Sequence, residues 1–203
     1  MLIDLAISFS FGYILGSIPF GLVLVYLATS QDIRTIGSGN IGATNVLRSG
    51  HKELALLTLF LDALKGTIAF FIVCLWLPPE SAALAGFGSV VGHCFPVWLR
   101  FVGGKGVATG MAVITVVVPF TGLIMAATWL LVAAFTRISS LSAMLSFVTA
   151  GLFVSFGPFE NSGIAQITVW GVGLLCWARH KQNIQRILSG EESKISFSKK
   201  PSD

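Results

Sequence analysis

Three polar segments of this chain combine glycines with basic residues, a pattern suited to binding phosphate. The first segment lies between Arg34 and Arg48, and its small and polar residues fall close together at Gly37, Ser38, Gly39, Asn40, Gly42, Thr44 and Asn45. Glycine lets the backbone adopt positive φ and approach a ligand, and free N–H groups in such a loop bind anions. A helix beginning near Ile41 would direct its positive end toward the same place. The segment predicts a phosphate site; a flexible connection is the alternative.

The second segment places Lys105 among Gly103, Gly104 and Gly106. It resembles a nucleotide-binding P-loop only superficially, because Leu99 stands where the first glycine is needed and Gly106 follows the lysine in place of Ser or Thr. Nucleotide hydrolysis is therefore not predicted. We expect Lys105, at the start of a helix, to face a phosphate or a developing oxyanion. The alternative is a simple lysine anchor at a membrane surface.

The third segment follows the last apolar stretch and contains His180, Asn183 and Arg186. Positions 179, 183 and 186 share one side of a helix, so these side chains are expected to face one vestibule. We expect the segment to continue the preceding helix as an amphipathic helix along the membrane surface. An ordinary basic juxtamembrane helix is the alternative.

Charged residues also occur inside apolar stretches. Asp62 and Lys65 are three residues apart, so they share a helix face and can pair, either as a clamp inside the bundle or as part of a site. His93 lies at the end of another apolar stretch, where it is either a general base or a hydrogen-bonded interfacial histidine. In the sequence, no carboxylate neighbours Ser38 or Lys105.

The composition is that of a membrane protein. Of the 203 residues, 54% are hydrophobic and 11% charged, and the mean hydropathy is +0.84. Long apolar runs recur from Leu2 to Trp177, which predicts an all-α polytopic membrane protein and argues against a removable signal peptide or a barrel. No nucleic-acid partner is expected.

The cysteines indicate no special chemistry. Cys74, Cys94 and Cys176 lie in or beside apolar stretches, and their spacing matches neither a disulfide framework nor a zinc site. We therefore expect no metal and no cofactor.

The positions of the basic residues predict the topology. Hydropathy suggests seven transmembrane helices, near residues 4–28, 54–77, 81–99, 106–118, 120–136, 140–157 and 164–178. The stretch 106–136 could be one tilted helix or two helices broken near Pro119. With two, every Lys and Arg lies on one face, and the other face keeps only Asp4, Glu80 and Glu160. The positive-inside rule then places the N-terminus outside and the C-terminus in the cytoplasm. We expect one domain over 1–203, with 189–203 as a flexible cytoplasmic tail.

Taken together, the motifs resemble a known family of bacterial enzymes. They occur in one order over residues 12–191, as GSIPFG at 16–21, GSGNIGATNVLR at 37–48, DALKG at 62–66, GHCFP at 92–96, GGKGVAT at 103–109 and RHKQNIQR at 179–186. This pattern resembles the acyl-phosphate:glycerol-3-phosphate acyltransferase family of the PlsY type. One position departs from it, because Val102 stands where the family has a second lysine beside the glycine-rich loop.

The resemblance implies an inner-membrane enzyme of phospholipid biosynthesis with its active site facing the cytoplasm. Such an enzyme transfers a fatty acyl group from acyl phosphate to the 1-hydroxyl of glycerol 3-phosphate, giving lysophosphatidic acid and phosphate. Membrane lipids and an acyl-phosphate-forming enzyme would be its partners. The residues expected to act in catalysis are Ser38, Arg48, Lys105, His180 and Asn183. Those expected to contact substrate phosphate are Gly37, Gly39, Asn40, Asn45, Gly103, Gly104, Gly106 and Arg186, with His93, Asp62 and Lys65 in support.

Two other classes of protein are consistent with basic loops on a membrane protein. A transporter of organic phosphates usually has inverted repeats with interrupted helices, and no internal repeat is evident here. A lipid-binding scaffold would explain the basic tail but not the intramembrane Asp62. Product analysis distinguishes the three, because only an acyltransferase makes glycerol 3-phosphate soluble in organic solvent.

Overall fold

The computed structural model describes residues 2–158 and 163–195, and all its regular structure in that part of the chain is helical, as predicted. Ten α-helices and two short 3-10 helices, η1 and η2, follow one another without a strand among them. Their bounds are α1 Leu2–Gly16, α2 Phe20–Thr29, η1 Ile33–Thr35, α3 Ala43–Arg48, α4 Lys52–Cys74, α5 Pro79–Cys94, η2 Val97–Leu99, α6 Val107–Val117, α7 Pro119–Thr136, α8 Ser139–Phe156, α9 Gly163–Arg179 and α10 Lys181–Leu188.

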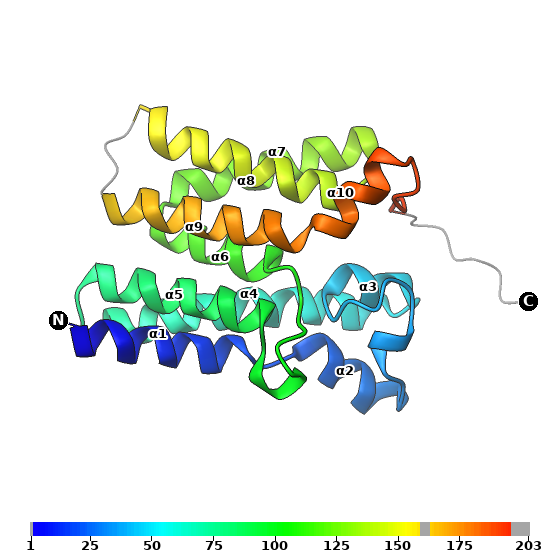
Figure 1. Cartoon of the computed structure of the whole chain (residues 1–203), viewed down its shortest axis with the longest axis horizontal. Helices are drawn as coiled ribbons and strands as arrows, with labels where there is room; N and C mark the ends of the chain where they lie inside the picture. Colours follow the sequence, from blue (N-terminus) through cyan, green and yellow to red (C-terminus); the bar gives the residue numbers. More distant parts are fainter. Residues whose placement is uncertain (1, 159–162, 196–203) are drawn as a thin grey trace, which may run out of the picture.

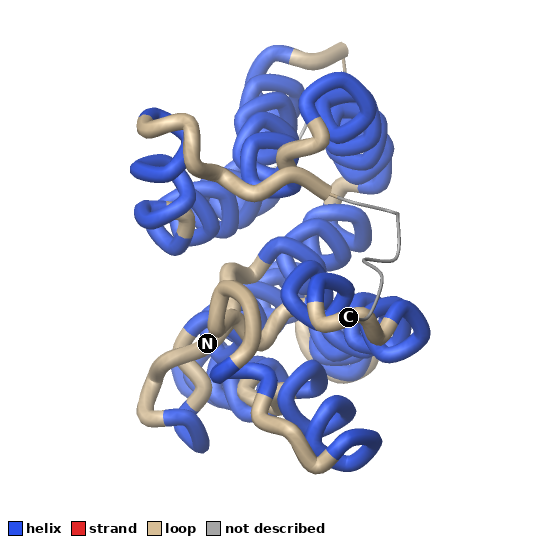
Figure 2. Tube along the Cα trace, turned by 90° about the vertical axis from the view of Figure 1, so that its right-hand side faces the viewer, coloured by secondary structure: helices blue, strands red, loops and turns tan. Residues whose placement is uncertain are grey.

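The long helices form two groups that run roughly parallel to the longest axis (Figure 1). One group contains α1, α4 and α5; the other contains α7, α8 and α9. Helix α6 lies between them and contacts α4, α5, α7 and α9. The end-on view in Figure 2 shows the two groups as separate clusters of helices.

The largest apolar core joins α6 to the second group. Val113 and Ile114 of α6 are fully buried and belong to one cluster with Phe147 of α8 and Val172 of α9. Because α6 also packs on α4 and α5, this short helix fixes the spacing between the two groups.

Five segments are long and apolar enough to cross a membrane: Leu2–Thr29, Lys52–Cys74, Pro79–Leu99, Pro119–Thr136 and Ser139–Phe156. Helix α6 has only 11 residues, about 16 Å at 1.5 Å per residue, whereas the hydrocarbon core is about 30 Å thick. The protein is therefore a multi-pass membrane protein, while the count of seven spans and the orientation of the termini stay predictions. Glu160 and residues 196–203 of the expected tail lie outside the described residues.

The first predicted span, 4–28, contains a break that we did not expect. Helix α1 ends at Gly16 and α2 begins at Phe20, because Pro19 has no N–H to donate and disfavours helical backbone at the residue before it. At the break, the carbonyl of Ile18 accepts from Phe20 N at 3.1 Å and also from Lys65 Nζ of α4 at 3.0 Å. The break thus supplies an acceptor for a buried charge.

The predicted break near Pro119 is confirmed. Helix α6 ends at Val117 and α7 begins at Pro119, so the alternative of one long tilted helix over 106–136 is wrong. The connections α2–α4, α7–α8 and α9–α10 consequently gather at one end of the molecule, opposite the N-terminus (Figure 1).

Candidate active site

A cavity of about 500 Å³ brings together residues from all three polar segments. Of the predicted site residues, it is lined by Ser38, Asn40, Asn45, Arg48, Asp62, His93, Lys105, His180 and Asn183. The predicted residues that are not among its lining residues are Gly37, Gly39, Gly103, Gly104, Gly106, Lys65 and Arg186. Val102 is 68% exposed and also does not line the cavity.

Asn45 holds the first loop in shape. Its Nδ2 donates to the carbonyls of Ile33, Ile36 and Asn40 at 3.1, 2.9 and 2.8 Å, and its Oδ1 accepts from Ser38 N at 2.9 Å. Gly37 has φ +58°, and a Cβ there would collide with Asn45 Oδ1. The polar atoms of the buried Asn45 are thus engaged within the loop, which supports a role in shaping it and presenting Ser38.

The second loop is held against the end of α5. Gly103 N donates to Cys94 O at 3.2 Å and Gly104 N donates to His93 O at 3.0 Å. Arg179 donates to the carbonyls of both glycines, at 3.0 and 3.1 Å. The N–H groups of Gly103 and Gly104 are therefore already hydrogen-bonded within the protein and do not donate to a ligand. Gly106 has φ +78° and caps α6, so the anion-facing donors here are Lys105 and the first N–H groups of α6.

Arg48 and Lys105 are the two cations that line the cavity. Lys105 Nζ makes no hydrogen bond or close ion pair with the described residues. Its burial lowers its pKa to about 8, an effect that Glu192 opposes and that Arg186 and Arg48 reinforce. Burial also lowers the pKa of Arg48, whose only hydrogen bond within the described chain is a long one of 3.4 Å to Ser193 O. Both cations are positioned without a close counter-ion.

The third segment bends at His180, where we expected a continuous helix. Helix α9 ends at Arg179, and His180 caps the N-terminus of α10. His180 Nδ1–H donates to Cys176 O at 2.7 Å, which leaves Nε2 as an acceptor. Burial, with help from nearby Lys105, lowers the pKa of His180 to about 4. The ring is therefore neutral at physiological pH.

Asp62, Lys65 and His93 form a buried cluster, which we call the buried clamp; Asp62 and His93 also line the cavity. Lys65 Nζ donates to Asp62 Oδ1 at 2.7 Å and to His93 Nδ1 at 2.9 Å, in addition to Ile18 O. Asp62 and Lys65 are each 2% exposed and His93 is 5% exposed. Because every ammonium proton has an acceptor, the cluster ties α4 to α5 and to the α1–α2 break, which favours the clamp over a catalytic role for Lys65.

Among the cavity-lining residues that sequence reasoning missed, Ser140 and Glu192 form a hydrogen-bonded group. Ser140 is the second residue of α8, and Glu192 follows α10 within the expected tail. Glu192 Oε1 accepts from Ser140 Oγ and from Asn183 Nδ2, both at 2.6 Å, and Oε2 accepts from Arg186 Nε at 2.7 Å. The available signal was an acidic residue within a basic segment; Glu192 is far from Ser38 and Lys105 in the sequence and becomes part of the same cavity only in the fold.

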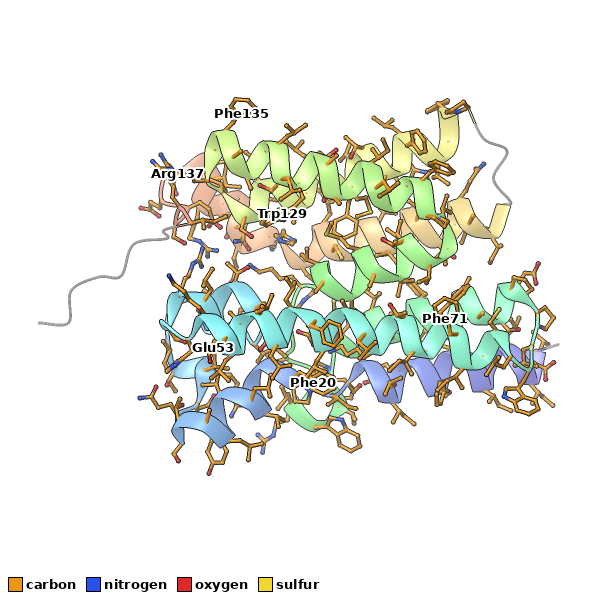
Figure 3. The ribbon with its side chains drawn as sticks, turned by 180° about the vertical axis from the view of Figure 1, so that it is seen from behind. Phe20, Glu53, Phe71, Trp129, Phe135 and Arg137 are labelled. Atoms are coloured by element: carbon orange, nitrogen blue, oxygen red, sulfur yellow. The ribbon has the colours of Figure 1, made fainter. Side chains whose placement is uncertain are left out.

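The cavity continues away from these polar groups as an apolar arm. Its walls come from Leu59 and Ala63 of α4 and from small or apolar residues of α6 and α7, namely Val107, Ala108, Met111, Ala112, Gly122, Ala126, Trp129 and Leu130. Leu59 and Leu130 are 47% and 63% exposed, so the arm reaches the lipid-facing surface between α4 and α7. Figure 3 labels Trp129 on α7 at this opening.

Comparison of the whole chain with known proteins identifies its family. The family model "Glycerol-3-phosphate acyltransferase" matches residues 6–190. The chain belongs to this family. It is 52% identical over 185 residues to the glycerol-3-phosphate acyltransferase of Sinorhizobium medicae, covering 91% of this chain and 89% of that protein. It is 50% identical over 191 residues to that of Nitrobacter winogradskyi, covering 93% and 95%.

Solved structures agree with the family assignment. The crystal structure of PlsY (YgiH), an integral membrane glycerol 3-phosphate acyltransferase, in its glycerol 3-phosphate form has a TM-score of 0.87 and 36% identity, covering 95% of this chain and 96% of that one. The lysophosphatidic acid form of the same enzyme has a TM-score of 0.85 and 35% identity, covering 95% of each chain. The resemblance drawn from the sequence motifs is thus confirmed, and the chain is an acyltransferase of the membrane.

Proposed function

We propose that this chain transfers a fatty acyl group from acyl phosphate to the 1-hydroxyl of glycerol 3-phosphate, releasing phosphate and lysophosphatidic acid. The observation that carries the proposal is the pair of cations without close counter-ions, Arg48 and Lys105, at the polar end of a cavity whose other end is apolar. Both substrates have a phosphate, and the donor also has a long hydrocarbon chain. The polar end of the cavity suits the phosphates, and the apolar end suits the hydrocarbon chain.

The apolar arm is suited to the acyl chain of the donor. It opens toward lipid between α4 and α7, past the half-exposed Leu59 and the exposed Leu130. Burying methylene groups there is favourable by about 0.8 kcal/mol each relative to water. Since both the donor and the product have acyl chains, a lateral opening lets them exchange with the bilayer without crossing water.

The chemistry needs positioning and charge neutralisation more than a strong base. The 1-hydroxyl oxygen attacks the carbonyl carbon of the acyl phosphate, and the bond from that carbon to the phosphate oxygen breaks. Phosphate leaves with the electron pair, and the hydroxyl proton passes to a phosphate oxygen of the substrate. Acyl phosphate is an activated anhydride, so holding the reactants together provides much of the rate. Lys105 and the N-terminus of α6 then stabilise the oxyanion and the leaving phosphate.

The active site is proposed to face the cytoplasm of the bacterial inner membrane. In support, Arg48, Lys105 and Arg137 lie on connections or helix ends that the positive-inside rule assigns to the cytoplasm. Cysteine-accessibility labelling tests this orientation. A cysteine at Glu80 should be labelled from outside and one at Arg137 only from inside; external labelling at Arg137 would contradict seven spans.

The decisive assay compares acyl donors. Purified protein is given labelled glycerol 3-phosphate with acyl phosphate, acyl coenzyme A or acyl carrier protein in parallel, and organic extraction measures the acylated product. We expect product with acyl phosphate alone, and none with the variant Lys105→Met. A product with another donor but not with acyl phosphate would refute the proposed donor. Uptake of glycerol 3-phosphate into proteoliposomes without any product would favour the transporter instead.

A further inference from the structure

Glu192 is a buried carboxylate at the edge of the cavity, and the proposed reaction gives it no role. It follows a turn in which Gly190 has φ +74°, and the N–H groups of Glu191 and Glu192 both donate to Arg186 O. The Glu192 side chain is 3% exposed. Burial favours its neutral form, but hydrogen bonds from Ser140, Asn183 and Arg186 outweigh burial and hold its pKa below the usual value. Glu192 therefore stays ionised and accepts only.

The carboxylate fixes the orientation of the Asn183 amide. Asn183 Nδ2 donates to Glu192 Oε1 at 2.6 Å. Turning the amide over would place its Oδ1 against the carboxylate oxygen at the same separation, and two acceptors repel each other. Asn183 is 3% exposed, so water offers little compensation. Only one orientation of this amide is consistent with an ionised Glu192.

That orientation leaves an unsatisfied acceptor. Within the described part of the chain, Asn183 Oδ1 is one of two buried side-chain polar atoms without a hydrogen-bond partner, and Asn183 lines the cavity. A buried acceptor without a donor is costly, about 1 to 3 kcal/mol, so such an atom in a substrate cavity indicates a donor supplied by the substrate. A phosphate oxygen cannot be that donor when ionised, so the partner of Oδ1 must be another group of the substrate.

We propose that Glu192 is a positioning residue which holds the Asn183 amide so that Oδ1 accepts a hydrogen bond from the 2-hydroxyl of glycerol 3-phosphate. This inference rests on the proposed function. The 1-hydroxyl gives its proton during acyl transfer, which leaves the 2-hydroxyl as the remaining donor of the substrate. Asn183 and Glu192 together then require a donor at the middle carbon.

Substrate discrimination tests this role. Dihydroxyacetone phosphate keeps a terminal hydroxyl and the phosphate but has a carbonyl at the middle carbon, which accepts and cannot donate. We expect the protein to prefer glycerol 3-phosphate by about a hundredfold or more in kcat/KM, since a site built to pair a substrate hydrogen bond rejects an analogue that cannot make it.

The variant Glu192→Gln should weaken this preference. Arg186 Nε still needs an acceptor, so the new glutamine side chain turns its oxygen toward Arg186 and its NH2 toward Asn183. Asn183 then accepts with Oδ1 and turns its Nδ2 into the cavity, where it can donate to a carbonyl. The ratio of the two kcat/KM values should fall at least about tenfold, with activity on dihydroxyacetone phosphate unchanged or higher. The matched control is Glu191→Gln, an exposed neighbouring acid, which should leave the ratio unchanged.

Two results would overturn the inference: a wild-type ratio near one, and an unchanged ratio in Glu192→Gln. If the unchanged ratio comes with a lower KM for glycerol 3-phosphate, Glu192 is a competitor of the substrate phosphate. If Glu192→Gln does not fold, Asn183→Ala is tested in its place. In this variant the ratio of the two kcat/KM values should fall, because activity on glycerol 3-phosphate is lost. A wild-type protein that acylates neither substrate would instead refute the proposed function.

Discussion

The chain buries two groups of charged residues, and they differ in how completely the charges are paired. In the buried clamp, the Lys65 ammonium has three acceptors from α4, α5 and the α1–α2 break. At the cavity, Lys105 has no close partner among the described residues, and Arg48 has one long hydrogen bond. A buried charge that is fully paired holds helices together. A cation that is positioned but unpaired favours the arrival of an anion.

The two groups of charges therefore have different roles: the paired charges of the buried clamp stabilise the fold, and the unpaired cations of the cavity serve binding and catalysis. Removing a charge from the buried clamp leaves its partner buried and unpaired, which damages the fold. Removing a cation from the cavity relieves repulsion between like charges and damages only binding and catalysis. This opposition between the stability of the fold and the activity of a site is common at functional positions.

The largest expected effect is on stability and comes from Asp62→Ala. This change leaves the Lys65 ammonium buried with one anionic partner fewer, at a cost of about 3 to 5 kcal/mol. We expect a clear fall in the thermal unfolding temperature in detergent, with poor yield. The matched control is Asp32→Ala, which breaks the exposed Asp32–Arg34 pair of 2.6 Å and should cost about 1 kcal/mol or less. Equal effects of the two changes would mean that burial does not distinguish the pairs.

The next effect is on activity and comes from Arg48→Ala and Lys105→Met. Each removes a phosphate-facing charge from a partly desolvated pocket, which costs about 2 to 4 kcal/mol of transition-state binding. We expect kcat/KM to fall at least about a hundredfold. The unfolding temperature should be unchanged or higher, because a desolvated cation is lost. Arg34→Ala, in the same loop but exposed and paired with Asp32, is the control and should stay active; near-normal activity in Lys105→Met would remove Lys105 from the site.

A smaller effect is expected from pH, through the same lysine. Only the protonated ammonium attracts phosphate, and burial lowers the Lys105 pKa to about 8 in the free protein. As pH rises through 8 the ammonium is lost, so kcat/KM should fall on the basic side. The folded pKa lies below the ordinary lysine value of 10.5; the stability cost of the buried charge is therefore present below about pH 8 and relieved as pH rises toward 10.5.

Lys105→Arg checks that assignment. Arginine stays charged over this range, so the basic limb should disappear. Activity should nevertheless remain below that of the original protein, because a longer, planar guanidinium does not place its charge where the compact ammonium lies. A basic limb that persists unchanged in Lys105→Arg would assign the ionisation to another group.

Most of the architecture could be predicted from local features of the sequence. Apolar runs and basic connections indicated the helices, and Pro119 correctly marked the boundary between α6 and α7. The break at Pro19 was missed because apolar residues continue on both sides of it, so hydropathy alone gives one segment. Pro19 produces the break locally, but the use of the break, as an acceptor for Lys65 at Ile18 O, is a long-range contact that sequence spacing does not reveal.

The site was predictable to the extent that its residues lie in glycine-rich or basic segments. Ser38, Arg48, Lys105, His180 and Asn183 do line one cavity. What spacing could not show is which polar atoms are already used. The N–H groups of Gly103 and Gly104 are bound to α5. Asn183 Nδ2 is bound to Glu192, a residue that becomes its neighbour only through the turn after α10.

The smallest expected effect is that of His180→Gln, and it bears on how the reacting hydroxyl loses its proton. In the cavity, His180 is neutral, with Nδ1 bonded to Cys176 O and a pKa of about 4. Its folded pKa is depressed, so it does not titrate between pH 5 and 8. If a substrate phosphate takes the proton, His180 contributes only one hydrogen bond, and His180→Gln should lower kcat about tenfold or less. The acid limb should remain, set by the substrate phosphate with a pKa of about 6.

The buried clamp supplies the comparison for this last test. His93 accepts from Lys65 and is buried, so its loss is expected to act through the fold and to lower the unfolding temperature along with activity. His93→Gln should slow the reaction by about tenfold or less in the fraction that folds, since neither histidine acts as the general base in the proposed mechanism. A thousandfold drop in kcat for either variant, with KM intact and the pH dependence flattened near that histidine's own pKa, would make it the general base. The proton would then pass to imidazole, and the positive charge formed there would lie within reach of Glu192 for His180 and of Asp62 for His93.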